Sequence, residues 1–144
     1  MQDVRIYEME QCSEAVVAAV NRLLAQLGGT YEPLSLTDLQ QLTASNDTHL
    51  FLMEADGDIV AMATLAFYAS PTGRKAWIED VVVDESCRNQ GFGRQIVQHA
   101  IDVAKLCPGC KLMLTSRPSR LAANHMYAAL GFERRETNVY QMRL

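Results

Sequence analysis

The stretch RNQGFGR, residues 88–94, constrains the fold of this chain more than any other part of the sequence. It places Gly91 and Gly93 between an apolar run at residues 81–83 and a segment with helical periodicity. Glycines in such a strand-to-helix turn let backbone N–H groups approach a bulky partner, because no Cβ stands in the way. At the N-terminus of a helix that partner is most often an anion. The stretch therefore predicts a strand, an anion-binding turn and a helix in succession.

Three phosphate-binding patterns compete for this stretch. A dinucleotide fingerprint needs a third glycine three residues after the second, and that position is Ile96. A P-loop needs lysine followed by serine or threonine, where this chain has Arg94 and Gln95. The remaining pattern, R-x-x-G-x-G, forms a shorter turn whose N–H groups make a concave nest for a pyrophosphate. A lone G-x-G is about as often only a tight turn, so the surroundings must decide.

Length and charge exclude several classes of protein. The 144 residues suit a single domain, 1–144, with one core. The formal net charge is −4, so the chain lacks the basic surface that a general nucleic-acid binder needs. The N-terminus has no apolar signal region, and no apolar run approaches membrane-spanning length. We therefore expect a cytoplasmic protein without a nucleic-acid or membrane partner.

Four cysteines raise the question of disulfide, zinc or redox chemistry. Cys107 and Cys110 form CPGC, which has the spacing of a redox pair, but such a pair usually opens a helix. Here it follows a helical segment and precedes a strand, and Pro108-Gly109 is typical of the turn between them. The three histidines show no spacing that completes a zinc site. We expect no metal and a structural turn at CPGC.

Apolar periodicity predicts one mixed α/β domain. Residues 49–68 form the clearest hairpin, in which two apolar strands meet at Asp56-Gly57. Ser35, with Asp38 three residues later, is close to a capping box and indicates a helix start. Strands are expected at residues 3–9, 75–83 and 111–116 and, as two short pieces, within 131–144; helices are expected at residues 13–27, 35–45, 93–106 and 119–130.

Two motifs together resemble the GNAT N-acetyltransferase superfamily. The first is the glycine loop, which follows the strand IEDVVVDES and opens an amphipathic helix. The second is NHMYAALGFERRE, which is similar to the closing helix of that family, with a tyrosine four residues before Gly-Phe. The order of the elements also matches over essentially the whole chain. The resemblance implies an α/β fold with a mixed, mostly antiparallel sheet of about six to seven strands, flanked by about four helices.

The resemblance also implies acetyl-CoA as the cosubstrate and indicates which residues hold it. Its pantetheine arm would pair with the backbone at Val81, Val82 and Val83, as an added strand would. Its pyrophosphate would lie on loop N–H groups, with added charge from the loop arginines. The loop residues concerned are Arg88, Asn89, Gln90, Gly91, Phe92, Gly93 and Arg94.

One position departs from the family pattern. Many relatives have an asparagine seven residues before the tyrosine, where this chain has Arg120. Two alternatives stay open for the missing contact. Either Asn124, one helical turn before the tyrosine, binds the cofactor arm, or Arg120 reaches a phosphate.

Acetyl transfer to an amine needs a base and an acid, because the amine loses a proton and the thiolate leaving group gains one. Glu79 lies two residues before the implied pantetheine strand and is the candidate base, directly or through water. Its neighbour Asp80 points to the opposite side if the strand is regular, and a bulge could reverse which of them faces the cleft. Tyr127 matches the family's tyrosine near the sulfur and is the candidate acid. A backbone N–H of residues 81–83 would meet the oxyanion.

The acceptor is expected to be a primary amine of a small molecule. Its side of the cleft would be supplied by acidic and aromatic residues, which suit a cationic amine: Tyr31, Glu32, Tyr68, Trp77 and Tyr140. A protein N-terminus or lysine is the second choice of acceptor. A domain that binds acetyl-CoA without turnover is the alternative from a different class. An exposed strand edge at the C-terminus could pair in a homodimer.

Overall fold

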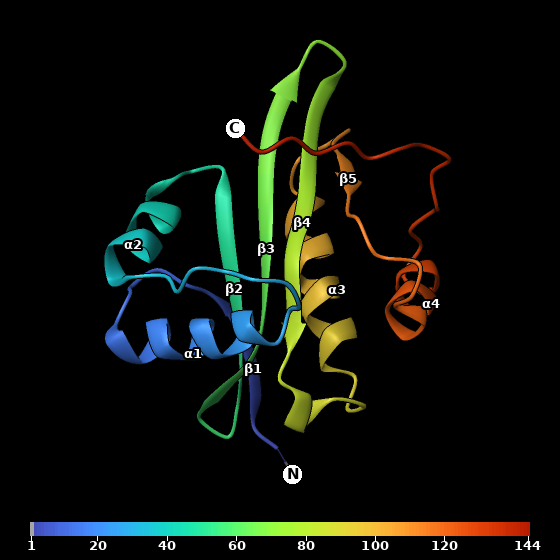
Figure 1. Ribbon diagram of the computed structural model, residues 1–144. Coiled ribbons are helices and arrows are strands. Elements are labelled where there is room, and N and C mark those ends of the chain that lie inside the picture. Colours follow the sequence, from blue (N-terminus) through green and yellow to red (C-terminus); the bar gives the residue numbers. More distant parts are fainter. Residues whose placement is uncertain (1) are drawn as a thin grey trace.

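Residues 2–144, the part that the computed structural model describes, form a five-stranded sheet with the strands in sequence order (Figure 1). The strands are β1 (Val4–Glu8), β2 (Thr48–Ala55), β3 (Asp58–Ser70), β4 (Gly73–Val83) and β5 (Lys111–Met113). Neighbours are antiparallel from β1 to β4, whereas β4 and β5 are parallel. The prediction of a mixed, mostly antiparallel sheet in an α/β fold is confirmed.

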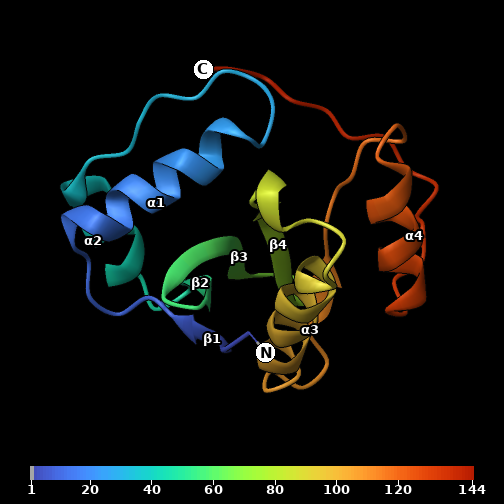
Figure 2. The ribbon, with the colours of Figure 1, turned by 90° about the horizontal axis from the view of Figure 1, so that it is seen from below.

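Helices cover both faces of this sheet (Figure 2). Over the same residues the α-helices are α1 (Glu14–Ala25), α2 (Leu36–Ala44), α3 (Phe92–Ala104) and α4 (Leu121–Ala129), and the short 3-10 helix η1 (Glu85–Cys87) precedes α3. α1 and α2 lie on one face, and α3 and α4 lie on the other. The expected order of the helices is confirmed.

Side-chain caps begin the two helices of the α1–α2 face. The Ser13 hydroxyl accepts a hydrogen bond from the Val16 N–H at the start of α1. Ser35 and Asp38 form the predicted capping box, with distances of 3.1 and 2.8 Å. Such caps satisfy N–H groups that have no acceptor within the helix. α3 and α4 differ from them, because neither has a side-chain cap.

A separate hydrophobic core fills each side of the sheet. The core under α3 contains Phe51, Leu65 and Ile96, and the core under α1 and α2 contains Leu23 and Leu39. Each of these side chains is at most 1% exposed. Dense packing on both faces holds the strands between them in one position, and β4 is one of these strands.

β4 carries a bulge next to its centre. Its register with β3 shifts between Met62 and Thr64. Two β4 residues, Asp80 and Val81, therefore lie opposite a single β3 residue. Asp80 has a φ of +53°, in the left-handed region. The extra residue reverses the alternation, so Val81 packs in the same core as Ile78 instead of the opposite one.

β5 pairs with only the first part of β4. The parallel register joins residues 75–77 to residues 111–113 and ends there. From Ile78 onward, the edge of β4 that faces away from β3 has no strand partner in the described chain, and residues 114–117 diverge from it. A wedge therefore opens between β4 and the chain that follows β5.

The two short strands expected within 131–144 are not formed, and this prediction was wrong. The sheet of the described chain has five strands rather than six to seven, because no strand is assigned after β5. In the view of Figure 1, the segment leaves α4 and crosses in front of the upper parts of β4 and β3. Its apolar side chains stay exposed, Tyr140 at 88% and Met142 at 81%. Within residues 2–144, no helix combines the length and apolar character needed to cross a bilayer.

Candidate active site

The glycine loop presents an uncapped helix N-terminus. Gly91 directly precedes α3 with a φ of +79°, and Asn89 has a φ of +66°. The first hydrogen bond inside the helix runs from the Gln95 N–H to the Gly91 carbonyl at 3.1 Å. The N–H groups of residues 92–94 therefore have no acceptor within the helix. These donors and the positive end of the helix dipole suit an anion.

The two glycines lie in different surroundings. A Cβ on Gly91 would meet nothing within 4 Å, so glycine is favoured there by the left-handed backbone and not by a lack of space. A Cβ on Gly93 would lie 3.6 Å from Val83 and 3.8 Å from Met126, which are ordinary van der Waals distances. Gly93 therefore lies between side chains of β4 and α4 without a steric need for glycine.

A groove of about 680 Å³ extends from this loop between the end of β4 and α4. We call it the glycine-loop groove. Of the described residues that line it, Arg88, Arg94 and Arg120 are arginines, His125 is a histidine, and none is acidic. The groove therefore combines free backbone donors with an excess of positive charge, which suits a polyanionic ligand.

Most of the predicted cofactor residues meet in this groove. Its lining includes Val81, Val82, Val83, Arg88, Asn89, Gly91, Phe92, Gly93 and Arg94. Gln90 and Asn124 are absent from the lining. The Asn124 amide instead donates to the carbonyl oxygens of Arg117 at 3.0 Å and Pro118 at 3.4 Å. Of the two alternatives for the missing contact, Arg120 is the residue that lies in the groove.

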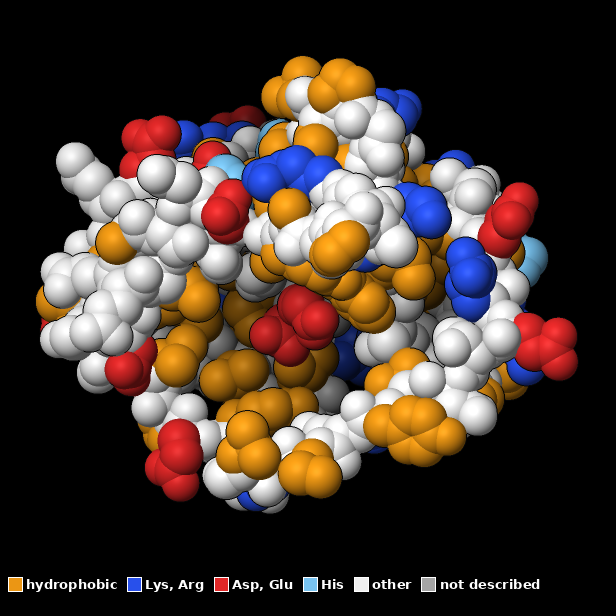
Figure 3. Space-filling model, turned by 90° about the horizontal axis from the view of Figure 1, so that it is seen from above, with side chains coloured by type: hydrophobic (Ala, Val, Ile, Leu, Met, Phe, Trp, Pro, Cys, Tyr) orange, Lys and Arg blue, Asp and Glu red, His pale blue; other side chains and the backbone are white. Residues whose placement is uncertain are grey.

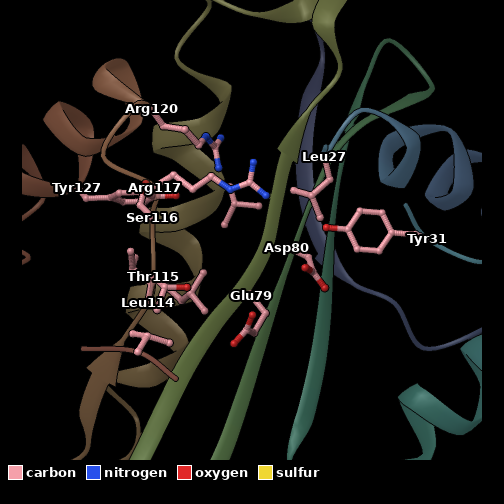
Figure 4. Close-up of a pocket in the computed structure, with 13 residues that line it drawn as sticks. Leu27, Tyr31, Glu79, Asp80, Leu114, Thr115, Ser116, Arg117, Arg120 and Tyr127 are labelled. Carbon is pink, nitrogen blue, oxygen red and sulfur yellow. The ribbon is translucent and has the colours of Figure 1, made fainter. Parts of the chain in front are cut away.

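A second cavity, of about 370 Å³, fills the wedge between β4 and the chain after β5 (Figure 4). We call it the carboxylate cavity. Its lining comes from β4 at residues 78–81, from residues 114–117, from the loop after α1 at Tyr31, and from the C-terminal segment at Val139. Viewed from above, acidic side chains lie at the floor of a hollow with mostly hydrophobic walls (Figure 3). A volume of this size suits a small ligand.

The two cavities join. They share four lining residues in the described chain: Leu27, Val81, Arg120 and Tyr127. A ligand that extends along the glycine-loop groove past the end of β4 therefore reaches the carboxylate cavity at Tyr127.

Glu79 and Asp80 both line the carboxylate cavity. Burial raises the pKa of the Glu79 carboxyl, and the neighbouring charge of Asp80 raises it further. Burial also raises the pKa of Asp80. Opposite orientations were expected for a regular strand, and the bulge is the reason that both carboxyl groups reach one cavity. Figure 4 shows Asp80 on the side of Tyr31 and Glu79 nearer Thr115.

Tyr127 lies where the two cavities meet and is 7% exposed. Its ring packs edge-on against Phe132 at 6.0 Å between centroids, which fixes its orientation. Burial raises the pKa of its phenol, and the charge of Arg120 opposes this rise. The phenol therefore keeps its proton at neutral pH and can donate it.

The comparisons with known proteins identify the family. The family model of the acetyltransferase (GNAT) family matches residues 16–132, most of the chain. The chain belongs to the GNAT acetyltransferase family. The streptothricin acetyltransferase of Streptomyces lavendulae is 32% identical over 78 residues. That match covers 54% of this chain, and the chain spans 40% of the length of this curated relative.

Solved structures share the GNAT fold over nearly the whole chain. A structure from Agrobacterium tumefaciens superposes with a TM-score of 0.80 at 26% identity, over 99% of both chains. An aminoglycoside N-acetyltransferase in complex with CoA superposes with a TM-score of 0.81 at 19% identity. That likeness covers 99% of this chain and 96% of the other. The fold that the sequence resemblance implied is confirmed.

Ser116 is a cavity residue that sequence reasoning missed. It lines the carboxylate cavity, and its buried hydroxyl has no hydrogen-bond partner within residues 2–144. A buried polar atom without a partner is uncommon, and a bound ligand is one way to satisfy it. No motif surrounds Ser116 in the sequence, so only the divergence of residues 114–117 from β4 reveals it.

Of the expected acceptor residues, only Tyr31 lines the carboxylate cavity. Trp77 donates through Nε1 to the Tyr68 hydroxyl at 3.4 Å, and this pair lies on the β3–β4 hairpin outside the lining. Tyr140 and Glu32 are exposed and are also outside it. The sequence therefore predicted the kind of side chain at the cavity, but most of the individual positions were wrong.

CPGC lies in neither cavity. The Cys110 N–H donates to the Cys107 carbonyl at 3.2 Å, which closes the predicted turn between α3 and β5. All four cysteines are free. Among residues 2–144, no group of three or more histidine, cysteine or acidic side chains is arranged to hold a metal ion. The structural interpretation of CPGC as a turn is confirmed.

Proposed function

We propose that this GNAT protein transfers an acetyl group from acetyl-CoA to a primary amine, with Glu79 as the general base and Tyr127 as the general acid. One observation carries the proposal. A basic groove with free helix N–H groups opens, at a buried tyrosine, into a cavity with two unpaired carboxyl groups. An anionic cosubstrate and a cationic acceptor each find the opposite charge, and they meet at a proton donor.

The glycine-loop groove fits acetyl-CoA along its length. The N–H groups of residues 92–94 would bind the pyrophosphate, and Arg88 and Arg94 would add charge. The free edge of β4 offers backbone groups to the pantetheine amides, as one strand does to another. This arrangement directs the thioester toward Tyr127 and the carboxylate cavity.

The reaction then follows from the two titrating side chains. The Glu79 carboxylate takes a proton from the acceptor ammonium, directly or through water, and frees the nitrogen lone pair. The nitrogen attacks the thioester carbonyl, so a C–N bond forms and the C–S bond breaks. A backbone N–H of residues 81–83 stabilises the oxyanion. Tyr127 supplies the proton that the departing thiolate accepts, and the extra proton still on the attacking nitrogen replaces it on the phenol. The products are the N-acetylated amine and CoA, and the proton held by Glu79 is released to solvent.

The acceptor is a small-molecule amine under this proposal. The carboxylate cavity measures about 370 Å³, and Tyr31 and Val139 stand at its walls. The similar streptothricin acetyltransferase and aminoglycoside N-acetyltransferase also bear the names of small-molecule acceptors. Acetylation of a protein N-terminus or lysine remains the second candidate, because the cavity is open to solvent.

The remaining parts of the proposal concern location and assembly. A cytoplasmic protein without a nucleic-acid or membrane partner fits a net charge of −4. In a homodimer, the exposed C-terminal residues Tyr140 and Met142 of one copy would pack against another. Light scattering of the purified protein measures the assembly, and a monomer at all concentrations would refute the dimer.

A turnover assay tests the proposed reaction. The purified protein is mixed with acetyl-CoA and a panel of primary amines, and free thiol is measured. Release that depends on a small amine supports the proposal. Thiol release only with peptides that carry a free N-terminus or a lysine would instead indicate a protein acetyltransferase. Acetyl-CoA binding without release for any amine leaves a non-catalytic binding module.

A further inference from the structure

The carboxylate cavity holds one more carboxyl group than the reaction needs. A single base is sufficient to deprotonate an acceptor amine, and Glu79 fills this role under the proposed function. Asp80 lines the same cavity, because the bulge adds it to that side of β4. A second carboxylate beside the first is unfavourable, as the rise in the pKa of Glu79 from the charge of Asp80 indicates.

Among residues 2–144, no ion pair offsets this charge. In the described chain, neither Glu79 nor Asp80 takes part in an ion pair. Arg117 and Arg120 line the same cavity, yet neither lowers the pKa of either carboxyl group. Figure 4 shows both guanidinium groups above the carboxylates, and Arg120 also belongs to the glycine-loop groove. The negative charge is therefore available to a ligand.

Asp80 faces a different part of the cavity from Glu79. Figure 4 shows Asp80 on the side of Tyr31, whose hydroxyl end points into the cavity, and Glu79 on the side of Thr115. A carboxylate beside a tyrosine hydroxyl forms a good binding site for an ammonium group, because both offer oxygen atoms that accept its hydrogen bonds. The cavity thus offers two neighbouring places for positive charge, of which the one at Glu79 lies nearer the residues after β5.

We propose that the acceptor is a diamine or polyamine, in which one amino group reacts at Glu79 while Asp80 and the hydroxyl of Tyr31 hold the second ammonium group. This inference rests on the proposed acetyltransferase function and specifies its substrate class. Asp80 is a specificity-determining residue in this account, because it contacts the acceptor but does not take the proton. The second ammonium group also gives ionised Asp80 a counter-charge, since Asp80 forms no ion pair within residues 2–144.

A series of matched amines tests the proposal. The probes are 1,3-diaminopropane, 1,4-diaminobutane and 1,5-diaminopentane, the monoamines propylamine, butylamine and pentylamine, and 4-aminobutanoate. The chains have equal length within each set and differ in the charge of the far end. We expect kcat/KM per amino group to be at least about tenfold higher for the best diamine than for its monoamine, as expected for one charged hydrogen bond.

Variants assign this preference to its residues. Asp80→Asn retains a residue type that tolerates the left-handed backbone, so the bulge is expected to fold. We expect it to reduce the diamine-to-monoamine ratio to within about twofold of one, mainly through KM, because the ion pair is lost. Tyr31→Phe keeps the ring but removes the hydroxyl, and it is expected to reduce the ratio as well. Asp58→Asn, on the exposed β2–β3 hairpin, removes the same charge elsewhere and is expected to leave the ratio unchanged.

The outcomes separate this proposal from the proposed function. Turnover of monoamines as fast as diamines, or a preference for 4-aminobutanoate, overturns the inference and leaves the acetyltransferase intact. A diamine preference that Asp80→Asn does not change also overturns it. No turnover of any amine by a folded protein that binds acetyl-CoA contradicts the proposed function itself.

Discussion

Glu79 and Asp80 owe their shared cavity to one extra residue in β4. In a regular strand the two side chains would face opposite sides of the sheet. The bulge, with Asp80 at a φ of +53°, directs both carboxyl groups into the wedge beside β5. Burial then raises the pKa of each, which is the direction that makes a carboxylate a stronger base.

Replacement of Glu79 by glutamine tests its role as the base. We expect Glu79→Gln to lower kcat by about 10²–10⁴-fold with little change in acetyl-CoA binding.

The wild-type rate is expected to rise with pH through a pKa above the ordinary value of 4.5, because the ionised form of Glu79 is active and burial raises its pKa. The charge of Asp80 also raises the pKa of Glu79, so in Asp80→Asn the increase of the rate is expected at lower pH. If the rate of Glu79→Gln still rises with pH over the same range, another group is the base.

Stability provides a second test at the residue scale. The pKa of Asp80 is raised in the folded protein, so its contribution to stability is present below the ordinary value of 3.8 and is lost as pH rises through the folded pKa. We therefore expect Asp80→Asn to be more stable than wild type at pH 7, with the difference shrinking as pH falls toward 3.8. Urea denaturation at several pH values measures this. A less stable variant at pH 7 would mean that ionised Asp80 has a stabilising partner.

At the scale of elements, α3 differs from α1 and α2 in its uncapped N-terminus. α1 and α2 satisfy N–H groups with Ser13 and Ser35, whereas α3 begins after Gly91 with none satisfied by a side chain. α4 also lacks a side-chain cap, so a missing cap alone does not mark a ligand site. The free donors of α3 differ because residues 92–94 line the glycine-loop groove, where the proposed cosubstrate would meet them.

Asn124 and Arg120 separate the structural and binding roles of α4. The Asn124 amide holds two carbonyl groups of the preceding turn, so Asn124→Ala is expected to lower the free energy of unfolding by about 0.5–1.5 kcal/mol. We expect its Kd for acetyl-CoA to change little. Arg120→Gln is expected to raise that Kd by about tenfold with little change in stability, because Arg120 lies in the groove. Denaturation and calorimetry on both variants measure the two effects, and the reverse pattern would contradict these assignments.

The elements differ in how well the sequence predicts them. The glycine loop and the capping box at Ser35 carry local signals, and both were predicted at the observed residues. Whether β4 contains a bulge could not be decided from the sequence, because residues 81–83 are apolar throughout and show no alternation that marks an extra residue. Asn124 looked like a cofactor contact from its spacing, but its hydrogen bonds to a nearby turn depend on geometry that spacing does not record.

At the scale of the whole molecule, the proposed function depends on the divergence of β4 and β5. Their pairing ends at Trp77 and Met113, and the two cavities meet in the space beyond. The sequence predicted both strands but not where their pairing stops, since each strand continues as an apolar run. The path of the C-terminal segment was also missed. Its alternating pattern is typical of a strand, yet in the view of Figure 1 it crosses in front of β4 and β3, and it places Val139 at the cavity.

Calorimetric titration with acetyl-CoA tests the central claim, that the glycine loop holds the cosubstrate, most directly. Gly91→Glu places a carboxylate at the anion site, and Gly57→Glu is its matched control. Both glycines have a positive φ, +79° and +86°, and open space around the Cβ position, but Gly57 lies on the β2–β3 hairpin. The strain of the substitution, about 1–2 kcal/mol, is therefore similar in both.

We expect wild type and Gly57→Glu to bind acetyl-CoA and folded Gly91→Glu to lose binding. The loss is expected to exceed tenfold in Kd, because a repelled charge replaces a favourable contact. Failure of folded wild-type protein to bind acetyl-CoA would contradict the central claim that the glycine loop holds this cosubstrate. Equal binding by Gly91→Glu and Gly57→Glu would show that the loop is only a turn.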